Sequence, residues 1–216
     1  MEVRSLTVEY RAILGPGGID VWLQQAALAA NLVKAFGALR HSIRFEGKGS
    51  DPADFQLALF LLEPGLTLRY RIDAVVIAPL AEDVDMIKTP LAAAMTSTAF
   101  EVLRATAPDA EVKTQRVFVN THAGIGPLTV QEILDRHVAG PEPFKAFSLT
   151  LVRNLGDGAI GTVLIEHSHL APVGPDNAFI QVTSTFPPTE TPASIQERTR
   201  EFHEETLRVL LEEHGK

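Results

Sequence analysis

Histidines are the residues whose type and spacing in this sequence most favour chemistry. His167 and His169 end the apolar run 159–169, and on a strand residues i and i+2 point to the same face. Two neutral imidazoles on one face can bind a transition metal, or one can move a proton near neutral pH. His122 in NTHAG (120–124) follows a predicted strand, where sites are often built. We predict a shared site of these three histidines, and both its metal-bound and its metal-free form stay open.

The segment NTHAGIGP (120–127) is the most polar, loop-like stretch of the chain. Asn120 and Thr121 offer hydrogen-bond donors and acceptors, and Gly124 and Gly126 allow the backbone to approach a ligand closely. We predict that Asn120, Thr121 and Gly124 bind substrate beside the histidines. The alternative is a plain connection between a strand and a helix.

A second candidate binding patch lies in LTLRYRIDAVVIA (66–78), which reads as one strand. The two-residue period of a strand puts Arg69, Arg71 and Asp73 on one face. Arg71, with Asp73 as its counter-ion, could hold an anionic group of a substrate. The alternative is a solvated sheet face with cross-strand ion pairs.

Composition excludes several classes of site. The chain has no cysteine, so disulfides, thiolate metal sites and a cysteine nucleophile are absent. GPGGID (15–20) has neither the dinucleotide nor the P-loop spacing, so the sequence predicts no nucleotide cofactor. The net charge of −8 disfavours nucleic acid as a partner, because an acidic surface repels phosphate.

The length and hydropathy of the chain indicate an ordinary globular protein. With 216 residues, 45% of them hydrophobic and no stretch typical of a linker, we expect a single domain over 1–216. The first residues lack the order of a signal peptide, and no apolar run reads as a membrane span. We therefore expect a soluble, cytoplasmic protein with no membrane partner.

The order of the predicted elements favours an α+β fold. Eight strands are predicted at 1–14, 41–47, 55–62, 66–78, 113–120, 146–152, 159–169 and 178–186, and four helices at 19–39, 90–106, 128–137 and 192–213. Because strands follow one another in hairpins, we predict a mainly antiparallel sheet covered by three or four helices. The order strand, helix, strand at 1–47 recurs at 66–120 and is compatible with an internal duplication.

Three functions are compatible with these features. The first is a small-molecule enzyme of lyase, isomerase or hydrolase type, with a histidine acid or base in a cleft between sheet and helices. The second is a small-ligand-binding protein without catalysis. The third is an assembly subunit whose alanine-rich helices pack against other copies, and we expect a homo-oligomer in any case. The sequence favours the enzyme, with a small molecule as its partner.

Overall fold

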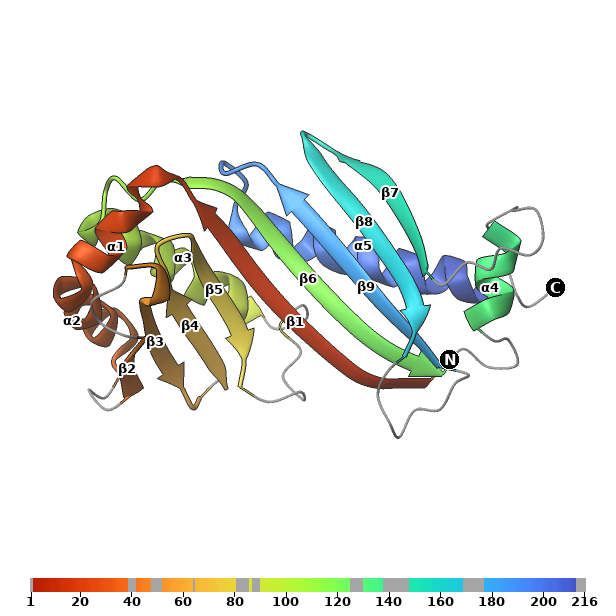
Figure 1. Ribbon diagram of the computed structural model, residues 1–216, viewed down its shortest axis with the longest axis horizontal. Coiled ribbons are helices and arrows are strands. Elements are labelled where there is room, and N and C mark those ends of the chain that lie inside the picture. Colours follow the sequence, from red (N-terminus) through yellow and green to blue (C-terminus); the bar gives the residue numbers. More distant parts are fainter. Residues whose placement is uncertain are drawn as a thin grey trace.

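The chain forms one continuous antiparallel sheet whose long helices lie on one side (Figure 1). The computed structural model describes residues 2–38, 42–47, 52–63, 65–80, 86, 90–124, 130–137, 148–168 and 177–212. The strands are β1 (Glu2–Leu14), β2 (Ile43–Glu46), β3 (Gln56–Leu61), β4 (Leu66–Tyr70), β5 (Ala74–Pro79), β6 (Val112–Gly124), β7 (Ser148–Gly156), β8 (Ala159–His167) and β9 (Asn177–Phe186). The α-helices are α1 (Ile19–Leu23), α2 (Gln25–Phe36), α3 (Pro90–Thr106), α4 (Val130–His137) and α5 (Pro192–Glu212), and short 3-10 turns lie at Pro16–Gly18 and Pro52–Asp54.

The predicted α+β class with a mainly antiparallel sheet is confirmed, and the sheet has nine strands where about eight were predicted. The additional strand arises because 66–78 turns back on itself instead of forming one strand. The backbone N–H of Arg71 donates to the carbonyl of Ala74 at 2.9 Å and closes the turn between β4 and β5. This turn has no glycine or proline, so no residue type in the sequence indicates it.

The sheet order reveals an internal repeat in the topology. The order is β2-β3-β4-β5-β1-β6-β9-β8-β7, with the long strands β1 and β6 paired at the centre. In each half the first strand is followed by helix, then by a meander whose last strand returns to the first, then by a long helix. The repeat therefore divides the chain before β6. The strand, helix, strand order predicted at 1–47 and 66–120 is present, but these ranges are not the repeating units, because β6 is the first strand of the second half.

The central strands have two different faces. Along β1, β6 and β9 buried residues alternate with partly exposed ones, which is the pattern of a sheet covered on one side. The buried residues include Val8, Val119 and Val182, and the helices α3 and α5 lie behind these strands in Figure 1. We call the opposite side, which carries Arg11 and Phe118, the open face; it points toward the viewer in Figure 1.

Helix α5 packs on the sheet through an apolar stripe. Ile195, Phe202 and Leu210 are buried, whereas Val209 is 40% exposed and does not belong to the stripe. The hydroxyl of Thr191 accepts a hydrogen bond from the backbone N–H of Ser194 at 3.3 Å and so caps the helix. No helix in the described parts of the chain is long and apolar enough to cross a membrane.

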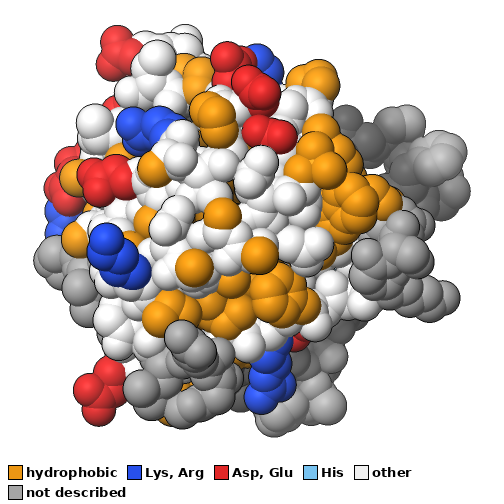
Figure 2. All heavy atoms as spheres, turned by 90° about the vertical axis from the view of Figure 1, so that its left-hand side faces the viewer, with side chains coloured by type: hydrophobic (Ala, Val, Ile, Leu, Met, Phe, Trp, Pro, Cys, Tyr) orange, Lys and Arg blue, Asp and Glu red, His pale blue; other side chains and the backbone are white. Residues whose placement is uncertain are grey.

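The alanine-rich helix predicted at 19–39 is divided in two at Gln24, where α1 ends and α2 begins. Leu28 and Leu32 are buried against the core, and the alanines of α2 mostly face outward. Figure 2 shows this end of the molecule, where hydrophobic side chains gather in patches. The exposed apolar residues of α1 are Ile19 and Leu23. Association through these helices stays a prediction.

Candidate functional site

The predicted site residue His122 lies on β6 and points to the open face. Its Nδ1 lies 2.8 Å from the hydroxyl oxygen of Ser168, and its ring centroid lies 4.9 Å from that of Phe179. Phe179 is its cross-strand partner on β9, and cross-strand partners share a face. The side chain is therefore held on both sides, by a hydroxyl and by an aromatic ring.

His167 lies at the end of β8 and belongs to the other face. Its cross-strand partner is Ala178, which in turn pairs with Ala123, and both alanines are fully buried on the helix-covered side. Residues that are adjacent along a strand point to opposite faces, so the register separates His167 from His122. The structure does not bring these two imidazoles to one hollow. His169 lies outside the described residues.

No described group of three histidine or acidic residues could hold a metal ion. The predicted ligands with described positions are His122 and His167, which lie on opposite faces. This finding concerns the ranges that the structure covers and leaves the role of His169 as a prediction.

The residues predicted to form a ligand-binding loop form part of strand β6. The prediction of a loop over 120–124 is wrong, because β9 pairs with β6 up to Gly124. Asn120 accepts a hydrogen bond from Gln181 at 2.8 Å, and the hydroxyl of Thr121 lies 2.9 Å from Nε2 of His203 on α5. The polar side chains of this stretch thus bond to neighbouring strands and to a helix. Gly126 lies outside the described residues.

Arg71 and Asp73 lie in the turn between β4 and β5. Their side chains form an ion pair of 3.1 Å and are both largely exposed. The prediction that they share one strand face with Arg69 is wrong, because Arg69 is on β4 and the other two follow it in the turn. The pair is a solvated contact at the end of the sheet, of the kind that contributes little to stability.

A large hollow lies between the sheet and the helices. This hollow, which we call the α3–α5 groove, has a volume of about 610 Å³. Its walls come from the second half of α3, the start of β6 and the connections that lead into β6 and α5. They are Phe100, Leu103, Arg104, Pro108, Ala110, Glu111, Val112, Gln115, Pro188, Thr189, Glu190, Thr191 and Pro192. Sequence reasoning missed these residues, and the only signal was the proline-rich run FPPTETP (186–192).

Gln115 fixes one wall of the α3–α5 groove. This side chain is 1% exposed, and its amide N–H group donates to the carbonyls of Pro187, Pro188 and Glu190 at 3.0, 3.2 and 2.9 Å. Its carbonyl oxygen accepts the hydroxyl of Tyr10. Burial raises the pKa of Tyr10, so the tyrosine stays a neutral donor. The connection between β9 and α5 is thereby attached to the sheet by one amide.

The two glutamates that line the groove each have a basic partner. Glu190 forms an ion pair with Arg198 at 3.3 Å, and both side chains are mostly buried. Glu111 accepts a hydrogen bond from Lys113, and this bond, with the positive charge behind it, lowers the pKa of the Glu111 carboxyl. Arg104 is exposed on α3 at the same groove. A carboxylate entering the groove would therefore meet an arginine at its edge.

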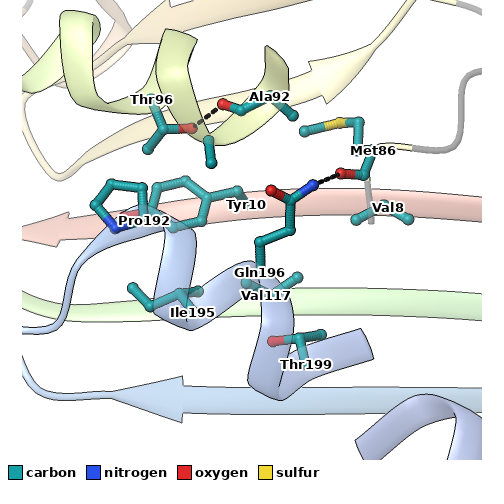
Figure 3. Close-up of a pocket in the computed structure, with 11 residues that line it drawn as sticks. Val8, Tyr10, Met86, Ala92, Thr96, Val117, Pro192, Ile195, Gln196 and Thr199 are labelled. Carbon is teal, nitrogen blue, oxygen red and sulfur yellow. Dashed lines mark hydrogen bonds between the residues drawn. The ribbon is translucent and has the colours of Figure 1, made fainter. Parts of the chain in front are cut away.

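A second, smaller cavity lies where α3 and α5 cross β1 and β6 (Figure 3). Its volume of about 30 Å³ has room for a water molecule and for no organic ligand. Gln196 crosses it and donates to the carbonyl of Met86 at 2.7 Å. The buried hydroxyl of Thr199 has no hydrogen-bond partner among the described residues. We interpret this cavity as a packing gap and take the larger α3–α5 groove as the candidate site for an organic ligand.

Comparison with known proteins adds little to this geometry. No family model and no curated protein matches the chain. The solved structures that match include one entitled "Methanococcus jannaschii TBP", with 17% sequence identity and a TM-score of 0.32 over 98% of this chain and 99% of that one. A likeness at this level carries no functional argument.

Proposed function

We propose that the protein binds a small molecule in the α3–α5 groove and that this binding is its function. The observation that carries the proposal is the groove itself. Its volume of about 610 Å³ falls within the range of small-molecule sites, and it joins an apolar floor to a few polar groups. Phe100 and Leu103 supply the floor, and Arg104 supplies a charge at the edge.

The pre-formed wall supports this proposal. Binding costs less when the site is ordered before the ligand arrives, because no segment loses freedom on association. The hydrogen bonds from Gln115 to the loop carbonyls of Pro187, Pro188 and Glu190 order the connection at 187–190 in advance. A surface groove with a mobile wall would lack such an internal attachment.

The lining favours a ligand with an apolar body and one anionic group. Leu103 is 1% exposed and Phe100 6%, so neighbouring residues cover most of both side chains and only a small apolar part of each lines the groove. A carboxylate or phosphate at the edge could accept charge-assisted hydrogen bonds from Arg104, whose guanidinium fits either group. No histidine is among the groove's described lining residues, so the proposal is binding without histidine acid–base chemistry.

The test is a binding screen with carboxylate-bearing aromatic and aliphatic compounds, followed by thermal unfolding and ligand-observed NMR. A compound at about 100 times its Kd should stabilise the protein by about 2.7 kcal/mol, which shifts Tm by roughly 5–11 °C in a chain of this size. Thr189→Trp places bulk at the exposed edge of the groove and should abolish the shift. Arg104→Gln should weaken binding by about tenfold or more.

Lys34→Gln is the matched control, because Lys34 is an exposed cation on α2 outside the groove. Its variant should bind like the wild type. The proposal is refuted if no compound binds more tightly than about 1 mM. It is equally refuted if compounds bind Thr189→Trp and the wild type with the same affinity.

A further inference from the structure

Four arginines from different strands lie in one row across the open face. The pairing register runs from Arg44 on β2 through Ala58 to Arg69 on β4, and continues through Val76 to Arg11 on β1. Arg11 pairs directly with Arg116 on β6. Because cross-strand partners share a face, all four guanidinium groups rise from the same side of the sheet. We call these four residues the arginine row.

The row extends over six adjacent strands. Neighbouring strands lie about 4.8 Å apart, so consecutive arginines are spaced by roughly 10, 10 and 5 Å and the row is about 24 Å long. The row crosses the strands, so its members lie far apart in sequence. The row therefore does not appear in the sequence as a run of basic residues, and the net charge of −8 does not indicate a basic surface.

The centre of the row is an unfavourable arrangement for a protein alone. Like charges directly opposite each other on neighbouring strands are destabilising, and Arg11 faces Arg116 in this way. Glu9 offsets part of the charge through an ion pair with Arg11 at 2.5 Å, yet Arg11 remains 42% exposed. Arg116 is exposed as well. An external anion between these two side chains would relieve the repulsion.

Aromatic rings lie beside the row. The guanidinium of Arg44 lies 5.0 Å from the ring centroid of Phe60, and that of Arg11 lies 5.4 Å from the ring centroid of Phe118. Flat guanidinium groups and aromatic rings are both surfaces on which nucleobases stack. A hollow of about 270 Å³ adjoins this part of the open face and is lined by Thr7, Val8, Glu9, Ala78, Pro79, Leu80 and Asn120.

We propose that the open face binds single-stranded nucleic acid, with phosphates on the arginine row and bases stacked beside it. Cations in a line combined with aromatic rings are the recognition chemistry of an unpaired strand, because a duplex keeps its base faces covered. The acidic charge of the rest of the chain confines binding to this face, and it made nucleic acid an unexpected partner from the sequence. The inference is independent of the α3–α5 groove, which lies on the other side of the sheet.

The test is fluorescence anisotropy with a labelled oligothymidylate of about 15 nucleotides, a length within the range of known single-strand sites. Four phosphate contacts predict a slope of about −2.8 for log K against log salt, so binding should weaken about 50-fold between roughly 50 and 200 mM KCl. Arg69→Gln and Arg116→Gln should each reduce the magnitude of the slope by about 0.7. Phe118→Leu should weaken binding about tenfold, since it removes a stacking surface.

Two further variants make the test specific. Glu9→Gln removes the competing carboxylate and should tighten binding, a gain that general damage to the fold would not produce. Arg208→Gln removes one exposed arginine from α5 and should leave binding and slope unchanged. Circular dichroism of each variant separates loss of binding from loss of folding.

Three outcomes overturn the proposal. The first is no binding tighter than about 100 µM at low salt, where electrostatic contacts are strongest. The second is a wild-type salt slope in the folded arginine variants, which would place the phosphates elsewhere. The third is equal binding of heparin and of oligothymidylate with no effect of Phe118→Leu, which would identify a general polyanion surface without base stacking.

Discussion

Replacing Gln115 with leucine should destabilise the protein more than most single substitutions. Leucine has nearly the same volume but can neither accept the Tyr10 hydroxyl nor donate to the loop carbonyls. The Tyr10 hydroxyl is buried, so it would lose its acceptor without gaining water. The connection at 187–190 would lose its attachment to the sheet at the same time.

The expected loss follows from the hydrogen bonds involved. A buried donor without a partner costs about 1–3 kcal/mol, and each ordinary hydrogen bond contributes about 1 kcal/mol net. The loop carbonyls recover part of their loss from solvent, so we expect about 3 kcal/mol in total. For a chain of this length that corresponds to a fall in Tm of roughly 6–12 °C.

Urea denaturation of Gln115→Leu, Tyr10→Phe and the double variant measures this loss. The double variant should lose about 1 kcal/mol less than the sum of the single variants, because the two side chains share one bond. Gln181→Leu is the matched control, since this half-buried glutamine donates to Asn120 alone among the bonds found here, and it should lose no more than about 1 kcal/mol. A loss below about 1 kcal/mol for Gln115→Leu, or strict additivity, would refute the reasoning.

Three other predictions concern the packing of the sheet and α5. Tyr10 and Tyr70 are the only tyrosines, and burial raises the pKa of each above its ordinary value of 10.0. The stabilisation from these two neutral tyrosines is therefore complete below pH 10, and above pH 10 the free energy of unfolding falls by about 2.7 kcal/mol per pH unit. Tyrosinate absorbance should then appear only together with unfolding seen by circular dichroism. A gradual tyrosinate signal from folded protein would contradict this. Gly161→Ala should cost about 1–3 kcal/mol in chemical denaturation, because a Cβ there would lie 2.4 Å from the ring of Phe202; an unchanged midpoint would count against the packing. Thr191→Ala should lower the free energy of unfolding by about 1 kcal/mol, seen as a lower Tm, because the helix cap is lost. Thr191→Ser should change the Tm little, because serine can form the same cap.

The sequence predicted most elements because their signals are local. Rough alternation and a high content of β-branched and aromatic side chains indicate the strand β1, and the pair Asp157-Gly158 is typical of the tight turn that joins β7 and β8. Both turn residues have positive φ, of 50° and 77°, which is why this pair suits such a turn. Thr89, which precedes Pro90, and Thr129, three residues before Glu132, are typical helix-start residues in the sequence, and both lie outside the described residues.

The candidate sites could not be predicted in the same way. NTHAG appeared to be a loop because its residues are polar and small, but β9 supplies a partner for each of them. The two-residue period correctly put neighbouring residues on opposite faces, yet only the pairing of β6 with β9 and β8 showed that His122 and His167 are separated by the sheet. The α3–α5 groove combines segments that lie up to 92 residues apart, from Phe100 to Pro192, so no local pattern describes it.

By itself, the sequence determined the class of fold and the absence of cysteine chemistry, since these depend on composition and on periods of two to four residues. The tertiary structure alone decided that β1 and β6 lie side by side and that four distant arginines form one row. The physical reason is that strand partners are selected by the burial of a whole face, which depends on all the strands and helices together.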